Sequence, residues 1–237
     1  MQQKKFREAE GLFVVEGIKL FHELVASSAY QIDEILIVED APLIDELQPE
    51  QALLLKIISK KDLERISGLK QPNQVLTVVK KKAIAQPDYS ADGLVLFLDD
   101  VKDPGNLGTI IRTADWFGVK QIVCSRTTVE LYNPKVVQAS MGSIFRMQMT
   151  YSELLPALDE AKSAGFDLVC ADMDGENLYD FQFNAKTGLV MGSESHGVSE
   201  DIRSITKAIT IPKKGQAESL NVAMACGIIS SEFNRST

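Results

Sequence analysis

Apolar runs and amphipathic segments alternate through residues 88–237. Short runs rich in Val, Ile and Leu predict buried strands, and apolar residues spaced three and four apart predict helices between them. Buried strands that alternate with helices are typical of an α/β fold with a mostly parallel sheet covered on both faces. The predicted strands are 94–98, 121–124, 145–149, 168–171, 188–191 and 208–211, and the predicted helices are 107–117, 134–140, 152–164 and 220–233.

Residues 1–87 show a smaller version of the same pattern. Residues 17–26 carry apolar side chains at helical spacing, and Ser59 is placed to cap a helix over residues 60–66. Residues 80–93 pass from three lysines through a proline to a glycine with little periodicity, which is typical of a linker. We therefore predict a small α/β domain over 1–87 and a larger domain over 88–237. Strands of the small domain are predicted at 35–38, 53–58 and 75–79.

Composition adds information mainly through charge. The chain has 237 residues, of which 45% are hydrophobic and 24% charged, so it is an ordinary globular protein and not a disordered or fibrous one. Residues 1–87 carry 12 Lys and Arg against 13 Asp and Glu, whereas residues 88–237 carry 13 against 20. The net charge of −8 therefore belongs mainly to the second part.

The cysteines and histidines indicate whether disulfides or a metal site are expected. Cys124, Cys170 and Cys226 lie far apart in apolar surroundings, which favours free buried thiols over disulfides. No apolar run reaches the ~18 residues of a membrane helix, and the N-terminus lacks a secretion signal, so we expect a cytoplasmic protein. The two histidines, His22 and His196, belong to no cluster with metal-ligand spacing. No metal requirement is expected, although a Mg²⁺ site made of carboxylates and water stays open.

Three loops that follow predicted strands carry the candidate chemistry, because ligands of parallel sheets bind at the carboxyl ends of the strands. In the first loop, Pro104 and Gly105 form a turn before a helix. Arg112 lies five residues after the buried Leu107, about 140° around the helix, so it points away from the apolar stripe together with Thr109. An isolated exposed arginine is usually structural. Here Arg112 shares the start of a helix with Asn106, near the expected ligand edge.

The second loop, residues 192–199, is bounded by glycines that allow backbone amides to approach a ligand, and Ser199 can cap a short helix after it. The stretch 193–197 differs by one substitution from the Gly-x-Ser-x-Gly pattern of hydrolases. A hydrolase is nevertheless disfavoured, because His196 is adjacent to Ser195 and such neighbours do not normally have the geometry of a nucleophile and its base.

The third loop runs from Ile211 into a helix whose first turns are small or apolar on nearly every side. Ser219 is a suitable N-cap for that helix, and Asn221 is an unusual polar residue at its start. No Gly-rich phosphate loop or dinucleotide-binding motif is present. Residue chemistry alone therefore predicts a parallel-sheet enzyme with a polar pocket, formed by Asn106, Arg112, Glu194, Ser219 and Asn221.

In this order, the three loops resemble the three motifs of the SpoU (TrmH-like) RNA 2′-O-ribose methyltransferases of the SPOUT superfamily. The matching stretches are NLGTIIRTA at 106–114, GSESHGVS at 192–199, and SLNV at 219–222 behind Ile211 and Pro212. The resemblance covers residues 94–233, and residues 11–17 resemble the start of a small RNA-binding domain that many members carry. Departures from the family pattern are Ser195, Lys213 and Ala223, and the first of these bears on cofactor affinity.

The resemblance implies a deep trefoil knot in the sheet, S-adenosylmethionine as cofactor, and a homodimer with its sites near the interface. It assigns activation of the ribose hydroxyl to Arg112, with Asn106, Glu194, Ser219 and Asn221 shaping the site. Because arginine is a poor general base, we expect Arg112 to orient the hydroxyl and offset its charge while a phosphate or water takes the proton. The implied cofactor-binding residues are Met191, Gly192, Glu194, Gly197, Ile211, Ser219, Leu220 and Asn221.

An RNA enzyme needs local positive charge, and the basic residues gather in or near the first part. The small domain resembles those of ribosomal RNA enzymes, which favours ribosomal over transfer RNA as the substrate. The alternatives are a tRNA 2′-O-methyltransferase and a non-catalytic RNA-binding protein of the same fold. The candidate RNA-binding residues are Lys4, Lys5, Arg7, Lys80, Lys81 and Lys82, followed by Lys60, Lys61 and Lys70.

Overall fold

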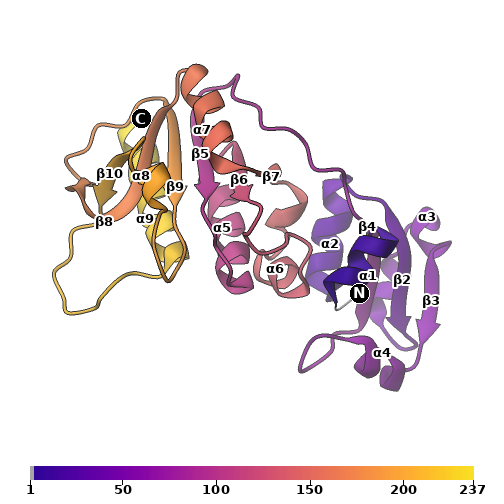
Figure 1. The fold of residues 1–237 in the computed structure, drawn as a ribbon. Coiled ribbons are helices and arrows are strands. Elements are labelled where there is room, and N and C mark those ends of the chain that lie inside the picture. The colour runs from indigo at the N-terminus through magenta and orange to yellow at the C-terminus, as the bar shows by residue number, and fades with distance from the viewer. Residues whose placement is uncertain (1–2) are drawn as a thin grey trace. The chain divides into compact units, whose positions relative to one another are not determined.

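The computed structural model describes residues 3–237, which form two compact units (Figure 1). Unit 1 runs to Ala83 and also contains Glu130–Arg146. Unit 2 comprises Ile84–Val129 and Met147–Thr237. The chain therefore leaves unit 1 after Ala83, returns to it at Glu130, and leaves it again after Arg146. No sequence pattern predicted this return.

Unit 2 is built on a six-stranded sheet in the order β10-β8-β9-β5-β6-β7, and every neighbouring pair is parallel. The predicted α/β fold with a mostly parallel sheet is therefore confirmed. The strands are β5 (Gly93–Leu98), β6 (Gln121–Ser125), β7 (Met149–Ser152), β8 (Asp167–Asn177), β9 (Lys186–Met191) and β10 (Lys207–Thr210), and the helices are α5 (Pro104–Trp116), α7 (Leu154–Ser163), α8 (Glu200–Arg203) and α9 (Val222–Ser236).

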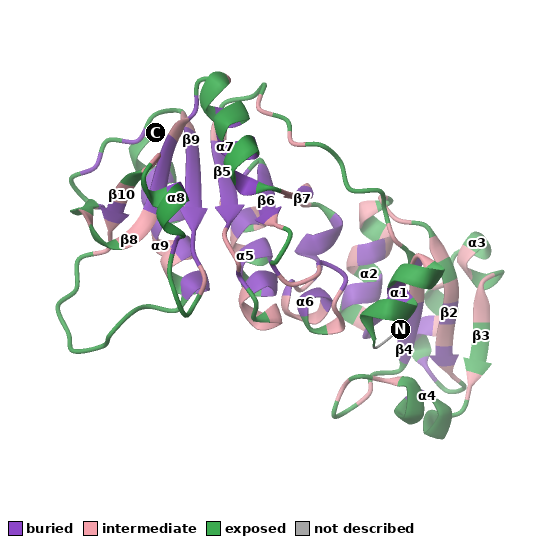
Figure 2. Ribbon diagram, viewed as in Figure 1, coloured by how far each residue is buried: buried purple, intermediate pink, exposed green. Residues whose placement is uncertain are grey.

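The central strands of this sheet are buried over most of their length (Figure 2). Val95 and Phe97 of β5 pack in one core cluster with Leu158 and Ala161 of α7. The intervening Leu96 is also fully buried and points to the opposite face, because side chains alternate along a strand. Both faces are covered, which explains why these strands are continuous apolar runs.

Unit 1 contains a four-stranded sheet in the order β1-β4-β2-β3, in which only β2 and β3 are parallel. Ser59 caps α4 as predicted, since its Oγ accepts a hydrogen bond from the Asp62 amide at 3.1 Å. The elements are α1 (Lys4–Glu10), β1 (Leu12–Glu16), α2 (Ile18–Ser27), β2 (Ile32–Val38), a 3₁₀ turn (Pro42–Glu46), α3 (Pro49–Ala52), β3 (Leu55–Ile58), α4 (Lys60–Ile66), β4 (Val75–Lys80), α6 (Pro134–Ala139) and a second 3₁₀ turn (Ser143–Phe145).

One predicted strand is displaced. The strand expected at 145–149 begins only at Met149, and Phe145 ends a 3₁₀ turn. Phe145 is buried in unit 1, where its ring lies 5.6 Å from that of Tyr30. Its apolar character therefore reflects packing in unit 1 and not membership of the parallel sheet.

The structure also bears on the expectations for the thiols, for membrane helices and for metal sites. Cys124, Cys170 and Cys226 are free and buried, as predicted. Within residues 3–237, no helix combines the length and apolar character needed to cross a bilayer. In the same residues, no three His, Cys, Asp or Glu side chains gather in a way that could hold a metal ion.

Candidate active site

The candidate site lies at the carboxyl edge of the unit 2 sheet, where the parallel strands β5, β9 and β10 end. The loops after these strands are the three that the sequence singles out. The amide of Asp99 donates to the Met191 carbonyl at 2.8 Å, which holds the first two loops together where they leave β5 and β9. This shared edge brings residues about 100 positions apart in the chain into contact.

Asn106 sits at the centre of the site, in the first turn of α5. Asp103 caps this helix by accepting the Asn106 amide at 2.8 Å, and Pro104 begins it. The Asn106 side chain donates from Nδ2 to Glu194 Oε1 at 2.7 Å and accepts at Oδ1 from Asn221 Nδ2 at 2.8 Å. The structure therefore joins Asn106, Glu194 and Asn221 from three different loops.

Asn221, and not Ser219, caps the last helix. Its Oδ1 accepts from the amides of Ala223 and Met224 at 2.9 and 3.3 Å, and α9 begins at Val222 instead of Leu220. The prediction of Ser219 as N-cap is wrong, because Asn is an equally strong cap and stands directly before the buried part of the helix. Ser219 lies exposed in the preceding loop, and the structure does not bring it to the other polar residues.

The loop over 192–199 forms a tight turn, in which Ser193 and Gly197 exchange two backbone hydrogen bonds at 3.0 Å. A Cβ at Gly192 would lie 2.0 Å from the Gly197 carbonyl carbon, so only glycine fits there. Gly197 has a φ of 69°, which glycine adopts without strain. Gly192 therefore lets the two arms of the turn pack together, and only at Gly197, where a Cβ would meet no atom within 4 Å, is the backbone open to a ligand.

Asp99 is a site residue that the sequence analysis missed. Its Oδ2 accepts from the Ser199 amide at 2.8 Å, so it ties the second loop to the first one. Ser199 precedes α8 as predicted, but within residues 3–237 its side chain makes no capping hydrogen bond. An acidic residue directly after a buried strand was the available signal for Asp99.

Arg112 is exposed on α5, six residues beyond Asn106, and Thr109 is exposed as predicted. Among the residues that the structure describes, the Arg112 guanidinium makes no hydrogen bond or ion pair. A helix rises about 1.5 Å per residue, so roughly 9 Å along the axis separates Arg112 from Asn106. The two side chains also leave the helix about 120° apart, so a ligand must extend beyond the Asn106 cluster to meet this free cation.

The hydrolase alternative needs one correction. Ser195 Oγ lies 2.9 Å from His196 Nδ1, so these neighbours do make the contact that was not expected. Asp100 is near His196: burial raises the pKa of Asp100, but hydrogen bonds from Thr127 and Lys102 and the charges of Lys102 and His196 outweigh it and lower that pKa. Yet in the described part of the chain no carboxylate bonds to the His196 ring, so no complete triad is formed.

The residues expected to bind the cofactor lie on the second and third loops. Met191 and Gly192 are buried at the end of β9, and Ile211 follows β10. Leu220 exposes 52% of its surface although it is apolar, and only one oxygen of Glu194 is bonded within residues 3–237. Backbone amides, an exposed apolar side chain and a free carboxylate oxygen fit a ligand with an adenine ring and a cationic group.

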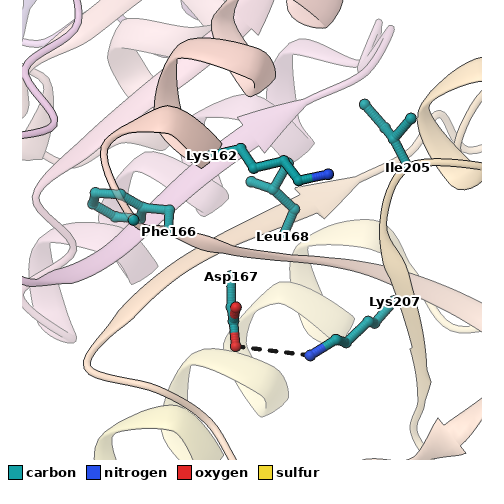
Figure 3. A pocket seen from close by; sticks show the side chains of 7 residues that line it. Lys162, Phe166, Asp167, Leu168, Ile205 and Lys207 are labelled. Carbon is teal, nitrogen blue, oxygen red and sulfur yellow. Dashed lines mark ion pairs between the residues drawn. The ribbon is translucent and has the colours of Figure 1, made fainter.

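A cavity of about 300 Å³ lies away from this site, at the amino ends of the strands (Figure 3). It opens where β8 and β10 begin, and Asp167 and Lys207 form an ion pair there at 3.8 Å. Ligands of parallel sheets bind at the carboxyl ends of strands, so we do not take this cavity as the active site. It is lined by Lys162, Gly165, Phe166, Asp167, Leu168, Ile205 and Lys207.

The candidate RNA-binding residues divide into two groups. Lys4, Lys5, Lys80 and Lys82 are exposed, and Lys4 pairs only loosely with Glu8 at 3.6 Å. Lys60, Lys61 and Lys70 are exposed as well. Arg7 is only 2% exposed and binds Glu130, which argues against the predicted RNA contact of this residue. Lys81 is partly buried against the same carboxylate.

Comparison with known proteins matches the two ends of the chain to two different profiles. The profile of the SpoU rRNA Methylase family matches residues 93–231, and that of the MRM3-like substrate binding domain matches residues 1–77. RlmP of Bacillus subtilis, a 23S rRNA guanosine 2′-O-methyltransferase, is 29% identical over 231 residues, which cover 97% of this chain and 91% of RlmP.

Two solved structures share the fold over nearly the whole chain. A TrmH-family protein from Porphyromonas gingivalis is 34% identical with a TM-score of 0.88, covering 100% of this chain and 94% of that one. The AdoMet-bound rRNA methyltransferase from Sinorhizobium meliloti is 26% identical with a TM-score of 0.88, covering 99% and 91%.

This chain therefore belongs to the SpoU rRNA methylase family. It is an RNA methyltransferase that transfers a methyl group from S-adenosylmethionine to a ribose 2′-hydroxyl. The family, the activity and the cofactor that the three motifs imply are confirmed.

Proposed function

We propose that ribosomal RNA is the substrate and that unit 1 binds it. The match of residues 1–77 to a substrate binding domain supports this role. The ribosomal RNA substrates named for RlmP and for the Sinorhizobium meliloti enzyme support the choice of RNA. The exposed Lys4, Lys5 and Lys80 are the first candidates for phosphate contacts, because lysine pairs with phosphate without reading sequence.

The observation that carries the proposed mechanism is the free Arg112 guanidinium on the helix that begins with the Asn106 cluster. Methyl transfer requires the 2′-oxygen to lie behind the methyl group and develops negative charge on that oxygen as its proton leaves. Arg112 orients the hydroxyl and offsets this charge. Arginine stays protonated at neutral pH, so an RNA phosphate or a water accepts the proton.

The cofactor supplies the methyl group on a sulfonium centre. Asn106 and Asn221 hold Glu194, whose free oxygen would accept a hydrogen bond from the cofactor or pair with its cationic group. Gly192 allows the tight turn to form, and Gly197 leaves its backbone open to the cofactor. Ser219, Leu220 and Ile211 would contact it from the third loop, as the motifs imply.

Transfer of radiolabelled methyl to in vitro transcribed 23S ribosomal RNA, with a tRNA mixture in parallel, tests this function. We expect label as 2′-O-methylribose in the ribosomal RNA only. Arg112→Ala should lower kcat at least 100-fold and leave the Kd of S-adenosylmethionine within twofold. Arg126→Ala is the matched control, because Arg126 is an exposed arginine of the same unit that pairs with Glu153.

Other outcomes have distinct meanings. Label in tRNA alone would assign a tRNA substrate. Cofactor binding without transfer to any RNA, including assembly particles, would favour a non-catalytic role. A pH–rate profile that follows deprotonation of Arg112 near neutrality would contradict the assigned role of this residue.

The homodimer, the knot and the cytoplasmic location are also part of this proposal. Trp116 at the end of α5 is 84% exposed, and an aromatic side chain this exposed supports a contact with a second copy. Membership of the family supports the knot in the loops after β9 and β10. Three free thiols support a reducing compartment.

A further inference from the structure

Glu130 binds two cations of unit 1 at once. Arg7 donates from Nη2 to Oε2 at 2.7 Å and from Nε to Oε1 at 3.0 Å, and Lys81 Nζ lies 3.3 Å from Oε1. A buried guanidinium is costly unless it is paired. Arg7 therefore cannot turn to an RNA phosphate without leaving a stable partner.

Aromatic packing reinforces the same contact. Tyr132 lies 4.5 Å from the Phe13 ring of β1, and its hydroxyl accepts the Lys82 amide at 3.2 Å. The ring of Tyr30 is 5.6 Å from that of Phe145, and its hydroxyl donates to the Ile144 carbonyl at 3.5 Å. Residues 130–146 thus complete the core of unit 1.

The place of residues 130–146 in the chain explains why the Glu130 contact matters. Residues 130–146 lie between β6 and β7, two neighbouring strands of the unit 2 sheet, and the methylase profile includes them. The chain consequently passes between the units after Ala83, after Val129 and after Arg146. The core of unit 1 is therefore completed by a segment that continues directly into β6 and β7 of unit 2, provided that 130–146 stays docked.

We propose that Glu130 is a positioning residue for the RNA substrate: it fastens residues 130–146 to the N-terminal segment of unit 1, and Arg7 and Lys81 serve this docking instead of contacting RNA. This inference rests on the proposed function for its RNA readout, but the docking itself can be measured without it.

The two roles for Arg7 and Lys81 predict opposite effects of Glu130→Gln. If both cations contacted phosphate, loss of the carboxylate would free them and strengthen RNA binding. Under the docking role, the KM for in vitro transcribed 23S ribosomal RNA rises about tenfold, while the Kd of S-adenosylmethionine stays within twofold. Glu130→Asp, which keeps the charge, should recover part of the loss. Glu10→Gln, at an exposed acidic residue of unit 1, is the matched control and should change neither value.

Lys81→Gln provides a milder variant that leaves the Arg7 pair intact. If Lys81 contacts a phosphate directly, its removal should reduce the magnitude of the slope of log K against log salt by about 0.7 to 0.9. Docking predicts weaker RNA binding with an unchanged slope. A slope of smaller magnitude in this variant would overturn the proposal for Lys81.

Hydrogen exchange separates this inference from the proposed function. In Glu130→Gln, amides of α6 (Pro134–Ala139) and β1 (Leu12–Glu16) should lose protection together, with or without RNA. Unchanged protection in both elements, or tighter RNA binding by this variant, overturns the docking role. If the wild type methylates no RNA while the exchange result is as expected, only the proposed substrate fails. If Glu130→Gln does not fold, Lys81→Gln is measured by the same exchange experiment.

Discussion

At the residue scale, the N-cap of α9 determines which atoms donate and which accept in the hydrogen bonds that join Asn221, Asn106 and Glu194. Asn221 Oδ1 is occupied by two α9 amides, so only its Nδ2 can face Asn106. Asn106 must then accept with Oδ1 and offer Nδ2 to Glu194, which as a carboxylate can only accept. Asn106 and Asn221 therefore act by holding Glu194.

Asn221→Asp tests this chain. Aspartate still caps α9, but it presents an oxygen where Asn106 requires a donor, so either orientation of the Asn106 amide leaves two oxygens face to face. We expect thermal stability to change little and the affinity for S-adenosylmethionine to fall about tenfold, measured by calorimetry. Asn234→Asp is the control, since it removes a donor to Phe117 from the same helix. Equal loss in both variants would contradict the chain.

The thiols give a second prediction at this scale. Burial raises the pKa of Cys226 to about 12 and also raises the pKa of Cys124 and Cys170. Thiolate is the reactive form, so the folded protein should not react with Ellman's reagent at pH 8, and all three thiols should react in denaturant. Rapid labelling of the native protein would show that a cysteine is accessible.

At the element scale, the turn after β9 depends on a glycine that has no room for a side chain. Gly192→Ala would place Cβ 2.0 Å from the Gly197 carbonyl carbon, so the turn must move. We expect at least a tenfold loss of cofactor affinity by calorimetry. Gly227→Ala on α9 is the control, because its Cβ would meet Thr113 at an ordinary 3.5 Å. That variant should bind normally and gain roughly 0.5–1 kcal/mol from helix propensity.

The ion cluster that joins α1 to residues 130–146 makes stability depend on pH. Burial raises the pKa of Glu130, but the hydrogen bonds and charges of Arg7 and Lys81 outweigh it and hold this pKa below its ordinary value. A depressed carboxyl pKa stabilises the fold above the unfolded value of about 4.5, and this contribution is lost as pH falls through the folded value. Urea unfolding from pH 7 to 3 should therefore show a smaller acid loss for Glu130→Gln than for the wild type.

At the scale of the whole molecule, exposed apolar residues on α5 and α9 bear on assembly. Thr109, Arg112 and Trp116 are exposed at helical spacing on α5, so a second copy that covers Trp116 would lie beside the proposed catalytic arginine. Trp116→Glu should convert the proposed dimer to a monomer in sedimentation velocity and lower methyl transfer. Tyr179→Glu, at another exposed aromatic residue of unit 2, should do neither. A wild-type monomer at micromolar concentration would contradict this assembly.

Much of the architecture was determined by the sequence alone. The alternation of apolar runs and helical spacing predicted the α/β fold, and the Ser59 cap and the exposed face of Arg112 and Thr109 followed from neighbouring residues. The three motifs predicted the methyltransferase family and its cofactor. These features depend on residues within about four positions of one another, or on motif residues that the chemistry requires.

Only the tertiary structure decided which distant residues meet. Asn106 bonds to residues 88 and 115 positions away, and Arg7 bonds to a residue 123 positions away. From the local pattern, Arg7 was predicted to contact RNA and Phe145 to lie in a strand. Both side chains are buried in unit 1, because residues 130–146 fold against the N-terminal segment. Local periodicity shows which face of an element is apolar, but the partner that covers this face is set by the topology of the chain.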